Sequence, residues 1–185
     1  QLRPQSPQVE MEFQYPYILD SPFGADVKFH LYKRDTTFLD VNFELGASYL
    51  LEGGNYFKVF FNQISSRLLS INESNLLQTR QLPGQLDVSR SNLGVEWLWQ
   101  KLDYRFNPRK GWETKISTSG GLKTIRENSL ILGLSDANFE FESLYDSIQL
   151  NSFQGQINLE LARYFPTTSN QTFKLGLKGF YTLSA

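Results

Sequence analysis

Residues 39–51, LDVNFELGASYLL, decide the fold of this 185-residue chain. From Leu39 to Tyr49 every second residue is apolar, and the residues between them are polar or glycine. Side chains alternate between the two faces of a β-strand, whereas apolar positions on a helix recur every three or four residues. The stretch therefore predicts a β-strand with one apolar face and one polar face.

The same period of two recurs along the chain and predicts eight strands. The other seven runs cover residues 9–17, 26–31, 56–66, 92–100, 112–119, 156–161 and 173–183. Most runs have nine or more residues, whereas strands of globular proteins average about 5 to 6 and strands of membrane barrels need about 9 to 11. Strand length thus favours an antiparallel, up-and-down transmembrane β-barrel.

The connections between the predicted strands are short at one rim and mostly long at the other. The short turns, rich in Gly, Pro and Asn, are residues 19–24, 53–55, 107–111 and 166–171. The other connections are residues 33–37, which are short, and 67–90 and 126–152, which are long. Bacterial outer-membrane barrels have short periplasmic turns and longer outside loops. We therefore place the short turns at a periplasmic rim.

Composition excludes several classes of function. The net charge of −1 gives no field that would attract nucleic acid, and the lack of cysteine excludes disulfides and thiolate metal sites within this chain. A single histidine, His30, makes a Ser-His-acid triad or a histidine metal cluster improbable. We expect no enzyme activity, no catalytic or metal site and no cofactor.

Hydropathy is mild although aromatic residues are abundant. They make up 15% of the chain, while the mean hydropathy is −0.37 and no apolar run approaches the 18 residues of a spanning helix. A membrane barrel has this composition because only alternate residues face lipid. A soluble barrel or sandwich with its apolar face inward also has period two, so this alternative stays open.

In a membrane barrel, charged residues must face the lumen, because an unpartnered polar group in hydrocarbon costs several kcal/mol. The predicted lumen-facing residues are Glu10, Glu12, Asp40, Asn42, Glu44, Glu96, Glu113, Lys115, Glu160, Lys174 and Lys178. Aromatic residues near strand ends predict a girdle at the membrane interface. Its members are Trp97, Trp99, Tyr104, Tyr164, Tyr181 and, beside them, Trp112 and Phe165.

The clearest turn is the stretch Asn107-Pro108-Arg109-Lys110-Gly111-Trp112. Pro108 presets φ at the first corner, and Gly111 can adopt a positive φ before the strand resumes. We predict a periplasmic hairpin turn carried by Asn107, Pro108, Gly111 and Trp112, with Trp112 as an interfacial anchor. The pair Gly120-Gly121 predicts a bulge or bend in the strand that follows.

From about Trp97 onward the chain resembles the barrel of the BamA/TamA superfamily of outer-membrane assembly and translocation proteins, in its Bacteroidetes-like versions. The residues that carry the resemblance are 104–112 (YRFNPRKGW), 119–122 (SGGL), 162–166 (ARYFP) and 175–180 (LGLKGF). The family's order of strand, "F-x-P-x-x-G" turn, strand, outside loop and strand ending in "Y-F-P" looks the same here. The Arg-Gly-Phe signature of the family's sixth loop is not in these residues.

The resemblance implies a barrel segment of about eight strands, roughly the fourth to eleventh of sixteen, in the bacterial outer membrane. The implied partners are membrane lipids, unfolded outer-membrane proteins as clients, accessory lipoproteins, and the rest of the barrel or a second copy covering the edge strands. The domain would span residues 8–185, after a flexible lead-in of residues 1–7.

Three other functions remain open from the sequence. The barrel could anchor a surface or secreted enzyme such as a patatin-like phospholipase. It could be a complete eight-stranded barrel, in which the last strand pairs with the first. It could also be a soluble lipocalin-like binder.

Overall fold

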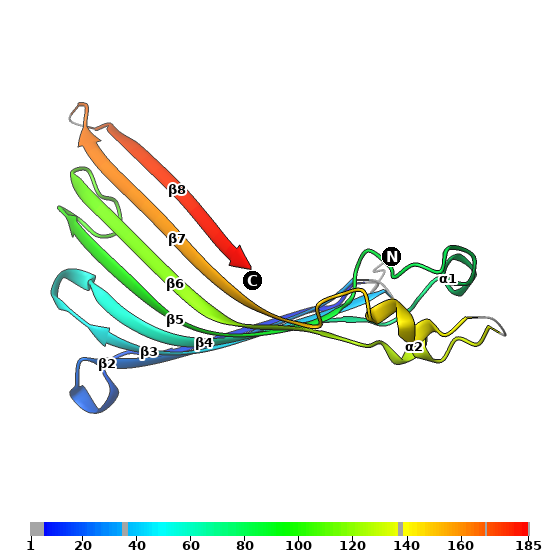
Figure 1. Ribbon diagram of the computed structural model, residues 1–185. Coiled ribbons are helices and arrows are strands. Elements are labelled where there is room, and N and C mark those ends of the chain that lie inside the picture. The colour runs from blue at the N-terminus through cyan, green and yellow to red at the C-terminus, as the bar shows by residue number, and fades with distance from the viewer. Residues whose placement is uncertain (1–5, 35–36, 137–138, 169, 185) are drawn as a thin grey trace, which may run out of the picture.

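The computed structural model describes residues 6–34, 37–136, 139–168 and 170–184, so the predicted lead-in is described only from Ser6 onward. These residues form one eight-stranded antiparallel sheet whose strands follow the order of the sequence (Figure 1). The strands are β1 (Gln8–Tyr15), β2 (Phe23–Arg34), β3 (Phe38–Leu50), β4 (Tyr56–Leu68), β5 (Asp87–Leu102), β6 (Gly111–Arg126), β7 (Asn151–Pro166) and β8 (Thr172–Ser184). The all-β, up-and-down prediction is confirmed.

Several strands are longer than the alternation alone predicts. Strands β5, β6 and β7 have 16 residues each, about three times the average for globular proteins. β1 instead ends at Tyr15, because Pro16 interrupts it and Tyr17 has a left-handed φ of 57°.

The predicted bulge at Gly120-Gly121 is wrong. The register of β6 with β5 and with β7 runs through both glycines without interruption. A Cβ atom at position 121 would collide with the carbonyl oxygen of Ser91, and one at Gly120 would lie 3.1 Å from the ring of Phe153. The close approach of the β5 backbone therefore accounts for Gly121.

The two α-helices lie beyond one end of the sheet, and the short hairpins lie at the other end (Figure 1). The helices at the long connections are α1 (Glu73–Thr79), α2 (Ser129–Leu132) and the 3-10 helix η3 (Phe141–Tyr145), while η1 (Ile18–Asp20) and η2 (Glu52–Gly54) lie in short hairpins. The connections 69–86 and 127–150 pack together, and we call them the loop cluster. Its core consists of Leu76, Ile131, Phe141 and Tyr145, each at most 3% exposed.

The fully buried apolar side chains of the described residues all belong to this loop cluster, and none belongs to the sheet. No helix covers either face of the sheet within the described ranges (Figure 1). None of the described helices is long and apolar enough to span a membrane. The molecule is thus a bare sheet with a small folded cap at one end.

The sheet is open. β1 pairs with β2 and β8 pairs with β7, and each is exposed along its whole length as an edge strand. The pairing of last strand with first that a complete eight-stranded barrel requires is not seen in the described residues. The sheet is twisted, so that Figure 1 shows it face-on near the short hairpins and nearly edge-on toward the loop cluster.

The hairpin ends of the strands are staggered. One row of directly paired residues runs Tyr15, Ala25, Ala47, Val59, Val95, Thr118, Ile157 and Tyr181. The row starts at Tyr15, the last residue of β1, and ends at Tyr181, in the second half of β8. Strands that close into a barrel must tilt, and tilt requires such a stagger.

Candidate functional site

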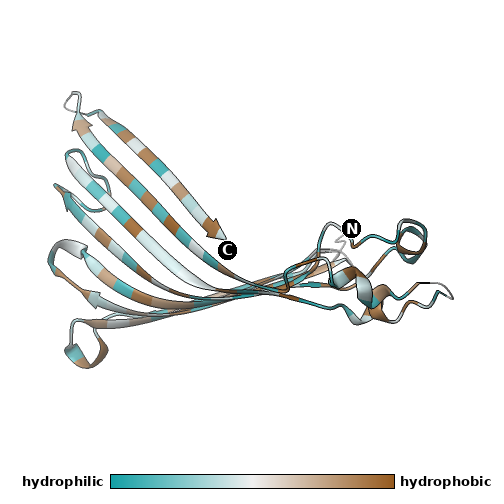
Figure 2. Cartoon of the chain, in the orientation of Figure 1, coloured by the Kyte–Doolittle hydropathy of each residue, from teal (hydrophilic) through white to brown (hydrophobic). Residues whose placement is uncertain are grey.

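The register divides the sheet into two chemically distinct faces. The apolar face holds residues such as Val27, Leu45, Phe61 and Leu93, which are directly paired on the neighbouring strands β2 to β5. Figure 2 shows the result as hydrophobic and hydrophilic bands alternating along the strands. The predicted alternation is therefore carried across the whole sheet by in-register pairing.

Exposure on these faces is the reverse of that in a soluble protein. Leu93 and Trp97 of the apolar face are 63% and 45% exposed, whereas Asp26 and Lys58 of the polar face are each 7% exposed. An apolar surface that extends across eight strands is far larger than the few hundred Å² that soluble monomers usually expose. The low exposure of the polar face in the central strands fits a sheet that curls around it, while the edge strands β1 and β8 are exposed on both faces.

All eleven residues predicted to face the lumen lie on the polar face. They are Glu10, Glu12, Asp40, Asn42, Glu44, Glu96, Glu113, Lys115, Glu160, Lys174 and Lys178. The charged and the apolar residues of the strands thus lie on opposite faces, as predicted.

Lys58 is the centre of the most buried ionic cluster. Its Nζ atom lies 2.6 Å from Oδ2 of Asp26 and 2.8 Å from Oε1 of Glu44. Gly46 lies beneath this contact, and a Cβ atom there would collide with the Lys58 side chain and come within 2.6 Å of Asp26. Three strands therefore combine to seat one lysine between two carboxylates.

A second cluster joins β4, β5 and β6. The hydroxyl of Tyr56 donates to Oε1 of Glu96 at 2.6 Å, and Nζ of Lys115 lies 3.1 Å from Oε2 of the same carboxylate. Lys178 and Glu160 form a third, exposed pair at 3.0 Å. Ion pairs with shared hydrogen bonds offset part of the desolvation cost of charged side chains where water is restricted.

Glu113 and Lys174 are among the predicted lumen residues that have no ion pair within 4.0 Å in the described part of the chain. Glu113 is paired in register with Gln100 and Ala162. Lys174 lies opposite Tyr164, with its ammonium 5.2 Å from the centre of the ring. His30 also lies on the polar face, where its Nε2 is 3.1 Å from the amide nitrogen of Gln8.

Three tryptophans form an aromatic cluster on the apolar face near the short hairpins. The rings of Trp97 and Trp99 stack with centroids 5.7 Å apart, and Trp112 meets Trp99 edge-on at 4.9 Å. Tyr104 lies in the following turn, is 61% exposed, and contacts the ring of Phe106. Trp97, Trp99 and Trp112 thus share the apolar face of β5 and β6.

The other two tyrosines of the predicted girdle lie elsewhere. Tyr164 is on the polar face, opposite Gly111 and Lys174, because it is out of phase with its apolar neighbours along β7. Tyr181 is on the apolar face, but its partner is Ile157 in the middle of β7. Nearness to a strand end, without phase and register, was an insufficient criterion for these two residues.

The apolar face contains a belt without charged residues. On β5 it runs from Ser89 to Trp99, bounded by Asp87 and Lys101, and on β7 it ends at Arg163. On β2 and β4 it ends, toward the loop cluster, at Lys33 and Arg67. We call this surface the charge-free belt.

Polar residues within the belt satisfy one another. Gln63 donates to Oγ of Ser89 at 2.9 Å and accepts from Oγ of Ser91 at 2.6 Å. Ser89 is consequently buried on a face where most neighbours are exposed. The alternation breaks here in sequence without breaking the strand.

Asp103 organises the β5–β6 hairpin, and sequence analysis missed it. Its Oδ1 accepts from the backbone amides of Tyr104 at 3.0 Å and of Arg109 and Lys110 at 2.9 Å. These hydrogen bonds, that of Lys110 foremost, hold the pKa of the Asp103 carboxyl below its ordinary value. An aspartate at the start of a turn is a known signal and could have identified it.

The predicted turn residues have the expected places. Gly111 has a φ of 129°, and a Cβ atom there would collide with the carbonyl oxygen of Lys101, so the prediction for this glycine is confirmed. Asn107 and Pro108 lie between β5 and β6, and Trp112 begins the apolar face of β6. Nη2 of Arg109 donates to the carbonyl oxygen of Thr168 at 2.6 Å, which ties this hairpin to the next.

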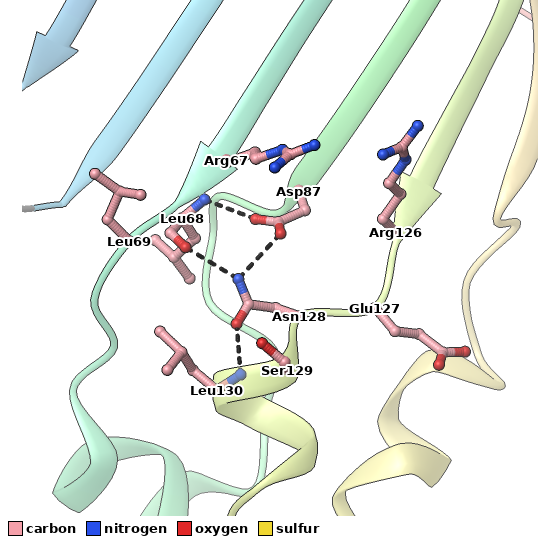
Figure 3. Close-up of a pocket in the computed structure, with 9 residues that line it drawn as sticks. All are labelled: Arg67, Leu68, Leu69, Asp87, Arg126, Glu127, Asn128, Ser129 and Leu130. Carbon is pink, nitrogen blue, oxygen red and sulfur yellow. Dashed lines mark hydrogen bonds between the residues drawn. The ribbon is translucent and has the colours of Figure 1, made fainter.

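A polar junction fixes the loop cluster to the sheet (Figure 3). The buried Asn128 donates through Nδ2 to the carbonyl oxygen of Leu68 and to Oδ2 of Asp87, both at 3.1 Å. Its backbone amide donates to the hydroxyl of Tyr145 at 3.1 Å. Burial raises the pKa of that hydroxyl above its ordinary value.

The described residues contain no group of three or more His, Cys, Asp or Glu side chains able to hold a metal ion. Comparison with protein-family models, with curated proteins and with solved structures gives no match. The candidate site is therefore the sheet surface itself.

Proposed function

We propose that this chain is a segment of a transmembrane β-barrel of the bacterial outer membrane, with its apolar face in lipid and its polar face toward the lumen. The observation that carries the proposal is the reversed exposure of the two faces. Leu93 and Trp97 are exposed where Lys58 and Asp26 are buried. Hydrocarbon around the apolar face would remove the cost of that exposure.

The dimensions of the charge-free belt support the same proposal. Its span from Ser89 to Trp99 corresponds to about 33 Å along a strand at the usual rise per residue. With strands tilted by roughly 40°, the height becomes about 25 Å, the height of the apolar band of outer-membrane barrels.

The staggered register supports membership in a larger closed barrel. The row from Tyr15 to Tyr181 has the offset that tilted strands need. Hydrocarbon provides no hydrogen-bond partner for the free backbone groups of β1 and β8. We infer that further strands of the barrel, or a second copy, pair with these two edges.

The chain's lack of cysteine allows a clean test. Ser117 and Thr118 are small neighbours on β6, with Ser117 on the polar face and Thr118 exposed on the apolar face. In intact membranes, we expect a water-soluble maleimide to label Ser117→Cys faster than Thr118→Cys. A soluble protein would show the opposite order, and that result would overturn the barrel proposal.

The proposed role of the barrel is outer-membrane protein assembly or translocation, and it rests on the resemblance of residues 104–112 and 162–166 to the BamA/TamA superfamily. Its clients would be unfolded outer-membrane proteins, aided by accessory lipoproteins. The resemblance carries no catalytic residue over to this chain.

The assembly role can be tested separately from the barrel. Depletion of the full-length protein in its native bacterium should lower the abundance of other outer-membrane barrels, with inner-membrane proteins as the control. Unchanged barrel abundance, together with membrane labelling as expected, would overturn the assembly role and favour an anchoring role.

A further inference from the structure

The charge-free belt ends, on the side of the loop cluster, at a row of basic residues. Lys33 pairs with Leu39, Leu39 pairs with Arg67, and Asp87 pairs with Arg126, so these positions continue one another across β2 to β6. Lys33, Arg67 and Arg126 lie on the apolar face. We call these three residues the basic border.

Asp87 is the one carboxylate of this row, and both of its oxygens accept hydrogen bonds from neighbouring groups. Oδ1 of Asp87 accepts from the backbone amide of Leu68 at 2.6 Å, and Oδ2 accepts from Asn128 at 3.1 Å (Figure 3). Asp87 makes no ion pair within 4.0 Å with Arg67 or Arg126 in the described residues. The two guanidinium groups thus keep their donors available.

A pocket of about 360 Å³ lies between the two arginines. Figure 3 shows Arg67 and Arg126 on either side of Asp87, on the strand side of the loop cluster. Leu69 and Leu130 supply apolar wall, and the Glu127 side chain is directed away from Arg67 (Figure 3). The site therefore presents two guanidinium groups beside an apolar wall, with the hydrogen-bonded carboxylate of Asp87 between them and that of Glu127 at its edge.

We infer that Arg67 and Arg126 bind the phosphate group of a net anionic membrane lipid, with Lys33 as a third cation on the same border. Arginine matches phosphate geometry with paired hydrogen bonds, and it is the residue best suited to anions near an apolar surface. The charge-free belt below the pocket would receive the acyl chains. This inference rests on the proposed barrel, because it needs the border to lie at headgroup level.

The test compares two double variants of the full-length protein. R67Q/R126Q removes the arginines of the pocket, while R90Q/K123Q removes a directly paired Arg90 and Lys123 from the polar face at a similar level. Native mass spectrometry of the detergent-purified protein measures retention of phosphatidylglycerol against zwitterionic phosphatidylcholine. We expect R67Q/R126Q to retain at least fivefold less phosphatidylglycerol, and R90Q/K123Q to retain as much as wild type.

Equal retention by R67Q/R126Q and wild type would overturn the inference, and so would an equal loss in both variants. Inorganic phosphate in excess should reduce retention only slightly, because the acyl chains contribute to binding; full displacement would point to a site for free phosphate and overturn the lipid assignment. Flotation of the wild-type protein with vesicles distinguishes failure of the barrel proposal from failure of the lipid-site inference. Failure to float overturns the barrel, whereas flotation with unchanged lipid retention overturns only the lipid site.

Discussion

Asp103 and Lys110 close the β5–β6 hairpin through two hydrogen bonds of opposite direction. The Asp103 backbone amide donates to the Lys110 carbonyl oxygen at 3.0 Å, and the Lys110 amide donates to the Asp103 carboxylate at 2.9 Å. The side chain thus completes a turn whose backbone ring would otherwise leave amides open to water.

Loss of the Asp103 carboxylate should destabilise this hairpin. We expect Asp103→Ala to lower the midpoint of urea unfolding in detergent micelles, and Asp103→Asn, which keeps an acceptor oxygen, to lower it less. Glu52→Ala, in the β3–β4 hairpin, removes a carboxylate without a comparable set of amide partners in the described residues and serves as the control. Equal effects of the Ala and Asn variants would contradict the acceptor role.

The Asp103 contribution should also depend on pH. Because the folded-state pKa is lowered, the contribution is fully present above the ordinary aspartate pKa of about 3.9 and is lost as the pH falls through the lower folded value. The difference in midpoint between wild type and Asp103→Asn should therefore be constant at neutral pH and shrink only in acid. A difference that shrinks between pH 8 and 6 would exclude this cause.

Lys58→Met should strongly destabilise the sheet, because Asp26 and Glu44 would remain together without their cation. Breaking a buried pair costs about 3 to 5 kcal/mol, whereas an exposed pair contributes at most about 1 kcal/mol. Lys178→Met is the matched control, since its side chain is 79% exposed. Urea unfolding in micelles measures both, and similar losses would show that the Lys58 cluster is well hydrated.

Gly121→Ala should be more damaging than Gly120→Ala, although the two glycines are adjacent. A methyl group at 121 meets the Ser91 backbone, which cannot move without disturbing β5, while at 120 it meets the edge of the Phe153 ring. Overpacking typically costs roughly 1 to 3 kcal/mol. Folding yield and unfolding midpoint provide the comparison, and equal losses would speak against the backbone contact.

Ile131→Ala should open the loop cluster and leave the sheet intact. Ile131 is fully buried, whereas its neighbour Leu130 is 43% exposed. Truncation of a buried isoleucine costs about 2 to 5 kcal/mol. Limited proteolysis should cut residues 127–150 much faster in Ile131→Ala than in Leu130→Ala, with β-sheet circular dichroism unchanged. Loss of the sheet signal would mean that the cap and the sheet fold as one unit.

The three tryptophans should lie at different depths in a bilayer. Trp97 lies farthest from the hairpins, Trp99 is next, and Trp112 is in register with the charged Lys101 and Arg163. In variants that keep a single tryptophan, deep-brominated lipids should quench Trp97 most, and shallow-brominated lipids should quench Trp112 most. The reverse order would contradict the orientation of the sheet.

The sequence was informative wherever one strand face is uniformly apolar. Residues 39–51 predict β3 almost to its observed ends, because no position from Leu39 to Tyr49 departs from the alternation. The start of β5 was missed because Ser89 and Ser91 occupy apolar-face positions, and only the contact with Gln63 on another strand makes them suitable there.

Properties that depend on the register between strands could not be predicted from the sequence alone. The position of Lys58 between Asp26 and Glu44 requires the pairing of three strands, and no local sequence pattern predicts it. The core contact between Leu76 and Ile131 joins two connections distant in sequence. The face of Tyr164, in contrast, could have been predicted from the sequence. Tyr164 is three residues after the apolar-face Leu161, and strict alternation along β7 places it on the polar face.

The loop cluster has a consequence for the order of events during folding. Leu76 follows β4, while Ile131 and Tyr145 follow β6, so the intervening hairpin of β5 and β6 separates the two halves of this core. Contacts between such distant segments form slowly, because the chain between them must first be ordered. Burial of Ile131 would therefore be a late step in folding. The time at which Ile131 becomes buried would report when the central strands β5 and β6 are complete.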